Sequence, residues 1–362
     1  MSGTPPALYL AEARSIHAAG QDPGSALAAV QTAASAARPH ASFKVPRPSG
    51  DGAAILHAPC QGVSGEQRIP ELLALLTASM ATPAQSASPR AAWLLLAPRQ
   101  TRRGAGLAAE PLRAEVAQAL GCDCQPVSEY AATAALEDIA RWLASAAPGA
   151  RAWLLGVDSL LATDTLLELG PSDALARAGA EGLVPGEAAA AVALSLSPPP
   201  GAQACIRGWS SRPEPAAAAP APGCLEALPG AVAKALAQAC VPAASVQEVV
   251  ALAAGDAASE LEWAQCAART WPTTLNAGQR HAIELGLMEA PPEAGRLPRR
   301  LGVGPVLGDV GAAWLPLVLG LIWRGRLWQA RWAALGVEPE PAPATLLCRH
   351  LGPGPRDAVV IA

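Results

Sequence analysis

Thiol and imidazole side chains are the groups in this sequence best suited to nucleophilic chemistry. There are eight cysteines and five histidines, and a thiol attacks substrates as the thiolate, which a helix N-terminus or a neighbouring cation promotes. The cysteines are scattered, and only Cys122 and Cys124 are near neighbours. One intervening residue is not the two-residue gap of a zinc knuckle or a redox motif. We therefore predict reduced thiols, with no metal site and no disulfide framework.

Other catalytic motifs are missing from the sequence. It contains no G-x-S-x-G, no P-loop, no H-E-x-x-H and no G-x-G-x-x-G after a strand. Gly302-x-Gly304 lacks the third glycine that opens a nucleotide-binding helix. Four carboxylates are predicted to be corner, capping or turn residues: Asp158, Asp164, Glu168 and Glu187. We predict no cofactor.

Composition excludes several classes of protein. Hydrophobic residues make up 51% of the 362 residues and charged residues 15%, which is typical of a well-buried globular chain. The net charge is −4 and the only lysines are Lys44 and Lys234, so nucleic acid is not an expected partner. The N-terminus lacks the pattern of a signal peptide, and the longest apolar run, Ala312 to Trp323, falls short of the roughly 20 residues of a membrane span. We expect a cytoplasmic protein that does not enter a membrane.

Strand and helix patterns alternate along the chain. Apolar runs typical of buried strands lie at 8–10, 91–97, 153–156, 188–196, 205–209 and 246–252, with short ones at 345–348 and 358–361. Helical periodicity is present at 26–37, 66–80, 110–120, 129–146, 225–239, 259–269 and 312–332. This order predicts an α/β fold in which helices pack on a mixed sheet.

Four segments carry a family resemblance. They are Gly156-Val157-Asp158-Ser159, Glu181 to Ala188, Leu307 to Ala313 and Gly352 to Val360. In their residue types and in their order along the chain, they resemble segments of the β-ketoacyl synthases of the thiolase-like superfamily. The resemblance implies two duplicated α/β halves, at residues 1–197 and 198–362, in five layers ordered α-β-α-β-α. It also implies a dimer formed by edge strands that pair across a two-fold axis.

The same resemblance implies which positions would carry catalysis. Condensing enzymes of this family use a cysteine at the N-terminus of a buried helix and two histidines. Here the cysteine position falls near Glu129, which we predict to be an ordinary N-terminal helix residue. The first histidine position falls near Asp256, after strand 246–252, and the second is occupied by Asp309. His281 and His350 are predicted to be structural or surface residues. No catalytic residue is assigned, and the protein is predicted to be a pseudoenzyme.

Three functions remain open from the sequence. The first is an inactive, cytoplasmic accessory factor for effectors of bacterial type VI secretion, which acts through protein–protein contact and forms a homodimer. The second is a chain-length-factor-like subunit, which pairs with an active ketosynthase and shares its acyl carrier protein. The third is an acyltransferase that uses acyl-CoA or acyl carrier protein with a new base, either Glu129 or Asp309.

Overall fold

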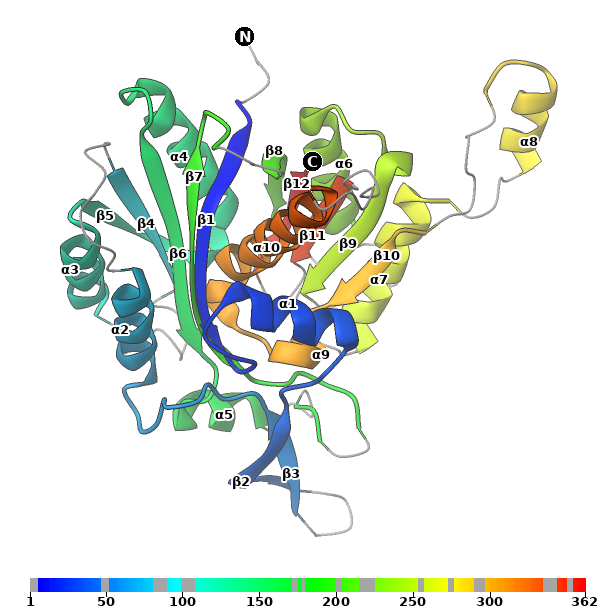
Figure 1. Ribbon diagram of the computed structural model, residues 1–362. Coiled ribbons are helices and arrows are strands. Elements are labelled where there is room, and N and C mark those ends of the chain that lie inside the picture. The colour runs from blue at the N-terminus through cyan, green and yellow to red at the C-terminus, as the bar shows by residue number, and fades with distance from the viewer. Residues whose placement is uncertain are drawn as a thin grey trace.

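A computed structural model describes most of the chain (Figure 1). The described residues are 6–46, 52–80, 90–98, 108–170, 175–177, 180–199, 204–214, 225–252, 257–272, 277–289, 297–334, 344–349 and 354–362.

The central element of the fold is a ten-stranded mixed sheet with the strand order β10-β9-β11-β12-β8-β1-β7-β6-β4-β5. The strands of the first half of the chain are β1 (Leu8–His17), β4 (Arg90–Leu96), β5 (Asp123–Ser128), β6 (Arg151–Ser159) and β7 (Glu187–Ser195). Those of the second half are β8 (Cys205–Arg212), β9 (Val246–Leu252), β10 (Arg299–Gly302), β11 (Ala344–Arg349) and β12 (Arg356–Ile361).

The two sets of five strands repeat one pattern of pairing. β4 runs parallel to β5 and β6, and β7 runs antiparallel to β6 and β1. In the same way β9 runs parallel to β10 and β11, and β12 runs antiparallel to β11 and β8. The sets meet where Leu8 and Tyr9 of β1 pair with Ile206 and Cys205 of β8. The division of the chain into halves at residues 1–197 and 198–362 stays a prediction from the sequence.

Helices form layers between and outside the two sets of strands. One core cluster joins inward-facing residues of both sets to α4 (Ala132–Ser145) and α10 (Trp314–Ala334). A second cluster packs α2 (Arg68–Met80) and α3 (Ala109–Leu120) on the outer face of the first set. A third packs α6 (Ala227–Ala239) and α7 (Ala257–Thr270) on the outer face of the second set. The predicted α-β-α-β-α layering is confirmed, and Figure 1 shows α10 between β1 and β9.

The residue pattern explains why α4 and α10 occupy the middle. Leu136, Ile139 and Leu143 of α4 recur at helical spacing and are buried, as the apolar stripe of this segment predicts. The first half of α10 is buried all round, because it contacts both β1 and β7 as well as α1 (Pro23–Thr32). No helix in the described part of the chain is both long enough and apolar enough to cross a membrane.

Several predicted element boundaries differ from those of the structure. The helix predicted from Glu129 begins as a 3-10 turn, η2 (Glu129–Ala131), and α4 follows it. The preceding strand β5 was missed because it lies at the sheet edge and buries only Cys124, so it has no apolar alternation. The Pro-rich stretch after residue 37 forms β2 (Arg38–Pro46), which pairs with β3 (Gly52–His57) in a separate hairpin.

Shorter elements complete the described chain. They are α5 (Thr163–Leu169), η5 (Ala243–Ser245), α8 (Ala277–Glu284), α9 (Gly304–Leu307) and η6 (Gly311–Ala313). Helix α1 is shorter than the predicted 26–37 and begins at Pro23. Asp22 caps it, since its carboxylate accepts from the backbone N–H groups of Gly24 and Ser25.

Candidate functional site: a buried ion pair at the entrance to helix α4

Glu129 lies at the turn where β5 ends and α4 begins. The Ser128 side chain caps this turn by accepting from the Tyr130 backbone N–H at 3.3 Å. Glu129 itself is 1% exposed, so its carboxylate is withdrawn from water. A carboxylate is stabilised at a helix N-terminus by the helix dipole, but burial this complete requires a further partner.

That partner is Arg349, the last residue of β11. Its Nη2 donates to Glu129 Oε2 at 2.7 Å, and its Nη1 donates to the Glu129 backbone carbonyl at 3.3 Å. The same guanidinium lies 5.9 Å from the ring centroids of both Tyr130 and Trp314. Arg349 is 5% exposed. The prediction of Glu129 as an ordinary helix-start residue was therefore incomplete, because its carboxylate forms a buried ion pair.

Trp314 links this pair to the segment that contains Asp309. Asp309 precedes η6, and its carboxylate accepts from the Gly311 backbone N–H at 2.9 Å. Asp158 at the end of β6 is fully buried and accepts from the Ala312 N–H at 2.9 Å. These two carboxylates shape the turn that leads into Trp314 at the start of α10. Asp309 thus has a structural role in this turn, and Asp158 is a corner residue as predicted.

A second buried ion pair lies on β12, on the opposite face of the sheet, which α6 and α7 cover. Arg356 donates through Nε to Glu262 of α7 at 2.7 Å and through Nη1 to the Gly354 carbonyl at 2.7 Å. The next residue, Asp357, is fully buried and faces the middle layer beside Arg349, with the side chain of Ser211 as a hydrogen-bonding neighbour. On the middle-layer face, two carboxylates, those of Glu129 and Asp357, therefore share the interior with one guanidinium, that of Arg349.

The charge imbalance has an electrostatic consequence for Asp357. Burial raises the pKa of its carboxyl to about 6, the Glu129 charge acts in the same direction, and the Arg349 guanidinium opposes both. Protonation of Asp357 would leave the Glu129 carboxylate matched to the Arg349 guanidinium. The cluster is thus close to neutral when this one carboxyl holds a proton.

The thiols and imidazoles in the described part of the chain lie away from the pair or are unsuited to attack. Cys124, at the second residue of β5, is buried, and burial raises the pKa of its thiol to about 12. Cys348 precedes Arg349 but packs on the opposite face of the sheet, against α6 and α7. Burial raises its pKa well above the ordinary value. His281 is exposed, as predicted, whereas Asp256 and His350 lie outside the described residues.

Glu187 was predicted to be a turn residue, and the structure gives it a larger role. It is the first residue of β7 and is fully buried. Its carboxylate accepts from Arg68 Nε and Nη2, both at 2.6 Å, from the Cys60 N–H at 2.8 Å and from Ser159 Oγ at 2.8 Å. All of its partners are within the protein, so this carboxylate fixes α2 to the end of β6.

Arg349 was not singled out from the sequence. The available signal is a charged residue at the end of the apolar strand 344–349, on the face that β-alternation directs toward the middle layer with Leu347. A buried arginine there requires a carboxylate partner, and Glu129 at a helix start was one candidate.

Comparison with solved structures places the fold. The chain resembles the ishigamide ketosynthase/chain length factor with a TM-score of 0.62 at 15% identity, over 98% of this chain and 99% of that one. It resembles a β-ketoacyl synthase from Burkholderia phymatum with a TM-score of 0.64 at 14% identity, over 98% and 99% of the two chains. It also resembles the ketosynthase ApeO in complex with its chain length factor ApeC from Xenorhabdus doucetiae, with a TM-score of 0.63 at 12% identity, over the full length of both chains.

No protein-family model matches the sequence, and a sequence comparison with curated proteins finds no match. The structural likeness at these low identities concerns the fold alone. The predicted thiolase-like fold is confirmed: this chain has the fold of ketosynthases and chain length factors.

Proposed function

We infer that the protein is a chain-length-factor-like partner subunit that pairs with an active ketosynthase. The observation that carries the proposal is the Glu129–Arg349 ion pair, which occupies the helix entrance where the family resemblance places the nucleophilic cysteine. A carboxylate bound by a buried guanidinium cannot form the acyl thioester that condensation requires. The fold is retained around it, which is what a subunit needs when it contributes a surface to a partner.

The solved structures that this chain resembles also support the proposal. Three of the similar structures contain a ketosynthase together with a chain length factor. A further one is a ketosynthase in complex with its acyl-carrier protein. By analogy, an active ketosynthase and an acyl carrier protein are the expected partners of this chain.

The test is a tagged pull-down of this chain from the cells that naturally produce it, followed by native mass spectrometry. We expect a complex of equal stoichiometry with a ketosynthase that carries its own cysteine. The purified chain alone should not condense malonyl groups on an acyl carrier protein, whereas the complex should. A chain that captures no ketosynthase, or that condenses malonyl groups alone, would overturn the proposal.

The secretion-accessory role and the homodimer that accompanies it remain predictions from the sequence resemblance. The same pull-down separates the roles, because recovery of a secretion effector or adaptor in place of a ketosynthase would favour the accessory role. The acyltransferase alternative requires a free base. Turnover of an acyl-CoA that is kept in Asp138→Asn and lost in Glu129→Gln, under conditions where circular dichroism shows both variants folded, would support it against our proposal.

A further inference from the structure

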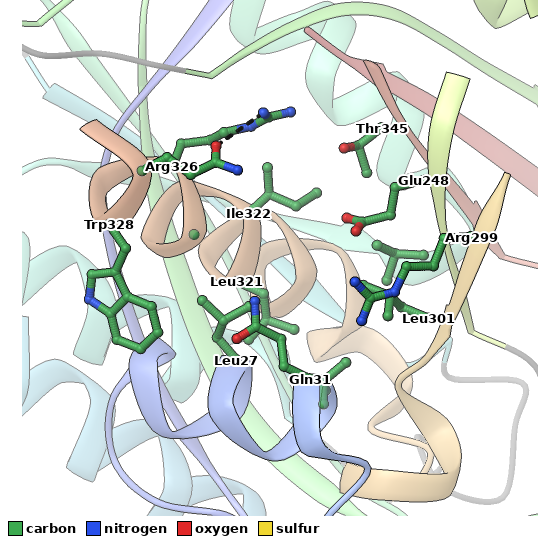
Figure 2. Close-up of a pocket in the computed structure, with 14 residues that line it drawn as sticks. Leu27, Gln31, Glu248, Arg299, Leu301, Leu321, Ile322, Arg326, Trp328 and Thr345 are labelled. Carbon is green, nitrogen blue, oxygen red and sulfur yellow. Dashed lines mark hydrogen bonds between the residues drawn. The ribbon is translucent and has the colours of Figure 1, made fainter. Parts of the chain in front are cut away.

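A cavity of about 280 Å³ lies apart from the ion-pair site, between α1, the second half of α10, and the strands β9, β10 and β11 (Figure 2). Its volume is just below the range of roughly 300–1,000 Å³ that holds drug-sized ligands. A cavity of this size suits a small ligand.

The cavity is at the opposite end of the elements that build the Glu129 site. Thr345, which lines it, is four residues before Arg349 on β11, a separation of about 13 Å along a strand. Arg326, which also lines it, is twelve residues after Trp314 on α10, or about 18 Å along a helix. A ligand here would not contact the ion pair.

One part of the cavity wall is apolar. Leu27 of α1 lies beside Leu321 and Ile322 of α10, and Val250 and Leu301 contribute from the strands. Gly325 also lines the wall, and the absence of its side chain keeps space open next to Leu27. Such a wall favours a short hydrocarbon group.

The remaining wall carries two guanidiniums and one carboxylate. Arg326 is 5% exposed and its Nη1 donates to Gln329 Oε1 at 3.3 Å. Arg299 is exposed, and Figure 2 shows its guanidinium and the Glu248 carboxylate directed toward the cavity. Among the described residues of the lining, these charges sum to one surplus positive charge.

Burial also acts on the pKa values of two of these charged groups. It raises the pKa of the Glu248 carboxyl, against the opposing effect of the Arg299 and Arg326 charges. It lowers the pKa of the Arg326 guanidinium, against the effect of Glu248. A buried cation is stabilised when an anion approaches it.

We propose that this cavity is a binding site for a small monocarboxylate with a short apolar chain. The carboxylate would lie between Arg299 and Arg326, and the chain would lie against Leu27 and Ile322. A single negative charge matches the single surplus positive charge. This proposal is independent of the proposed function, since it concerns a different end of the fold.

The test is isothermal titration calorimetry of the full-length protein with octanoate, with octanol and octylamine as matched neutral and cationic probes. We expect saturable one-to-one binding of octanoate and at least tenfold weaker binding of the other two. Arg299→Gln should weaken octanoate binding about tenfold, because it removes one charge-assisted contact. Arg141→Gln, at an exposed site on α4, should leave it unchanged.

A second variant tests the apolar wall. A Cβ at position 325 would lie 3.6 Å from Leu27 Cδ2, an ordinary contact, so Gly325→Leu should fold and place its side chain in the cavity. We expect it to abolish octanoate binding with unchanged circular dichroism. Absence of saturable binding to the wild type, equal binding of octanol, or undiminished binding by Arg299→Gln would each overturn the proposal. If Gly325→Leu does not fold, the proposal is tested by octanoate binding to Arg299→Gln and by the comparison of octanoate with octanol and octylamine.

Discussion

The guanidinium of Arg349 holds the carboxylate of Glu129 from a position 220 residues further along the chain. Glu129 begins the layer-forming helix of the first half, and Arg349 ends a strand of the second half. Both side chains are buried, so each charge depends on the other for the stabilisation that water would otherwise provide. The pair therefore connects the two halves of the chain, at the position where the family resemblance predicts the cysteine of a condensing enzyme.

Glu129→Gln should destabilise the fold by about 3–5 kcal/mol, because it leaves the Arg349 guanidinium buried without its counter-charge. Equilibrium unfolding in urea measures this as a fall in the transition midpoint. The matched control is Asp138→Asn. It removes an exposed partner of Arg141 on α4 and should cost under about 1 kcal/mol.

The double variant Glu129→Gln/Arg349→Met should recover most of the lost stability, since it leaves no unpaired charge. Recovery in the double variant separates the charge effect from a packing defect. The ion-pair account fails if Glu129→Gln costs no more than Asp138→Asn, or if the two substitutions at the pair are simply additive.

Asp357 makes stability depend on pH with a defined sign. Its pKa is raised in the folded protein from 3.8 to about 6, so between these values the unfolded chain releases the proton and the folded chain retains it. The contribution of Asp357 to the free energy of unfolding is therefore greatest below pH 4. It falls by about 3 kcal/mol in total as the pH rises through 6.

Asp357→Asn should remove this loss, because an amide cannot ionise. We expect wild type and variant to have similar unfolding midpoints near pH 4 and the variant to be more stable at pH 8. Urea unfolding of each protein at pH 4 and at pH 8 gives the change in its transition midpoint, and this change is compared between wild type and variant. A variant that is less stable than wild type at pH 8 would show that the Asp357 carboxylate is stabilised by the neighbouring guanidiniums and does not bear a net cost of burial.

The sequence predicted the elements whose patterns report burial. The strand at 246–252 and the apolar helix at 312–332 were found almost to the residue, because their side chains are buried on most sides. Edge strand β5 was missed, since an exposed strand does not need alternation. Strand β2 was missed for the same reason: only Val45 is buried among its described side chains.

The site was predictable only in part. The segment resemblance located Glu129, but it contained no information on which distant residue would neutralise the carboxylate. The Arg349 contact depends on the register of β11 and on the turn into Trp314. Both are products of tertiary packing, which a local pattern does not report. Glu248 was overlooked for a related reason, as a single acidic residue in a valine-rich strand has no motif.

Edge strand β5 leads to a prediction about assembly. It terminates the sheet, so one side of its backbone is not paired with any other described strand. The family resemblance implies that such an edge pairs with its counterpart in a second subunit. We expect a dimer at micromolar concentration by light scattering, or a heterodimer when a ketosynthase is present.

Gln125→Arg tests that edge, because it places an additional charge near the middle of β5, where two copies of the strand would meet. We expect weaker self-association. The control Gln118→Arg lies at an exposed position of α3 and should not change the mass. A monomeric wild type, or equal behaviour of the two arginine variants, would contradict pairing of identical subunits through β5.

Gly156 offers a test of the turn that positions Trp314. A Cβ at this residue of β6 would overlap the Ala312 carbonyl oxygen and lie 2.9 Å from Ala313 Cα, both rigid backbone atoms of η6. Gly156→Ala should therefore push η6 away from the sheet, cost about 1–3 kcal/mol, and move the Trp314 indole relative to Arg349. Urea unfolding measures the cost, and tryptophan fluorescence at pH 7 reports the displacement.

Gly325→Ala is the matched control for this substitution. It adds the same methyl group in the interior of α10, where the nearest atom would be Leu27 Cδ2 at 3.6 Å. Alanine favours a helix over glycine by up to about 1 kcal/mol, so this variant should be as stable as the wild type or more so. If Gly156→Ala were tolerated equally well, the close approach of β6 to η6 would not be what holds Trp314 against the ion pair.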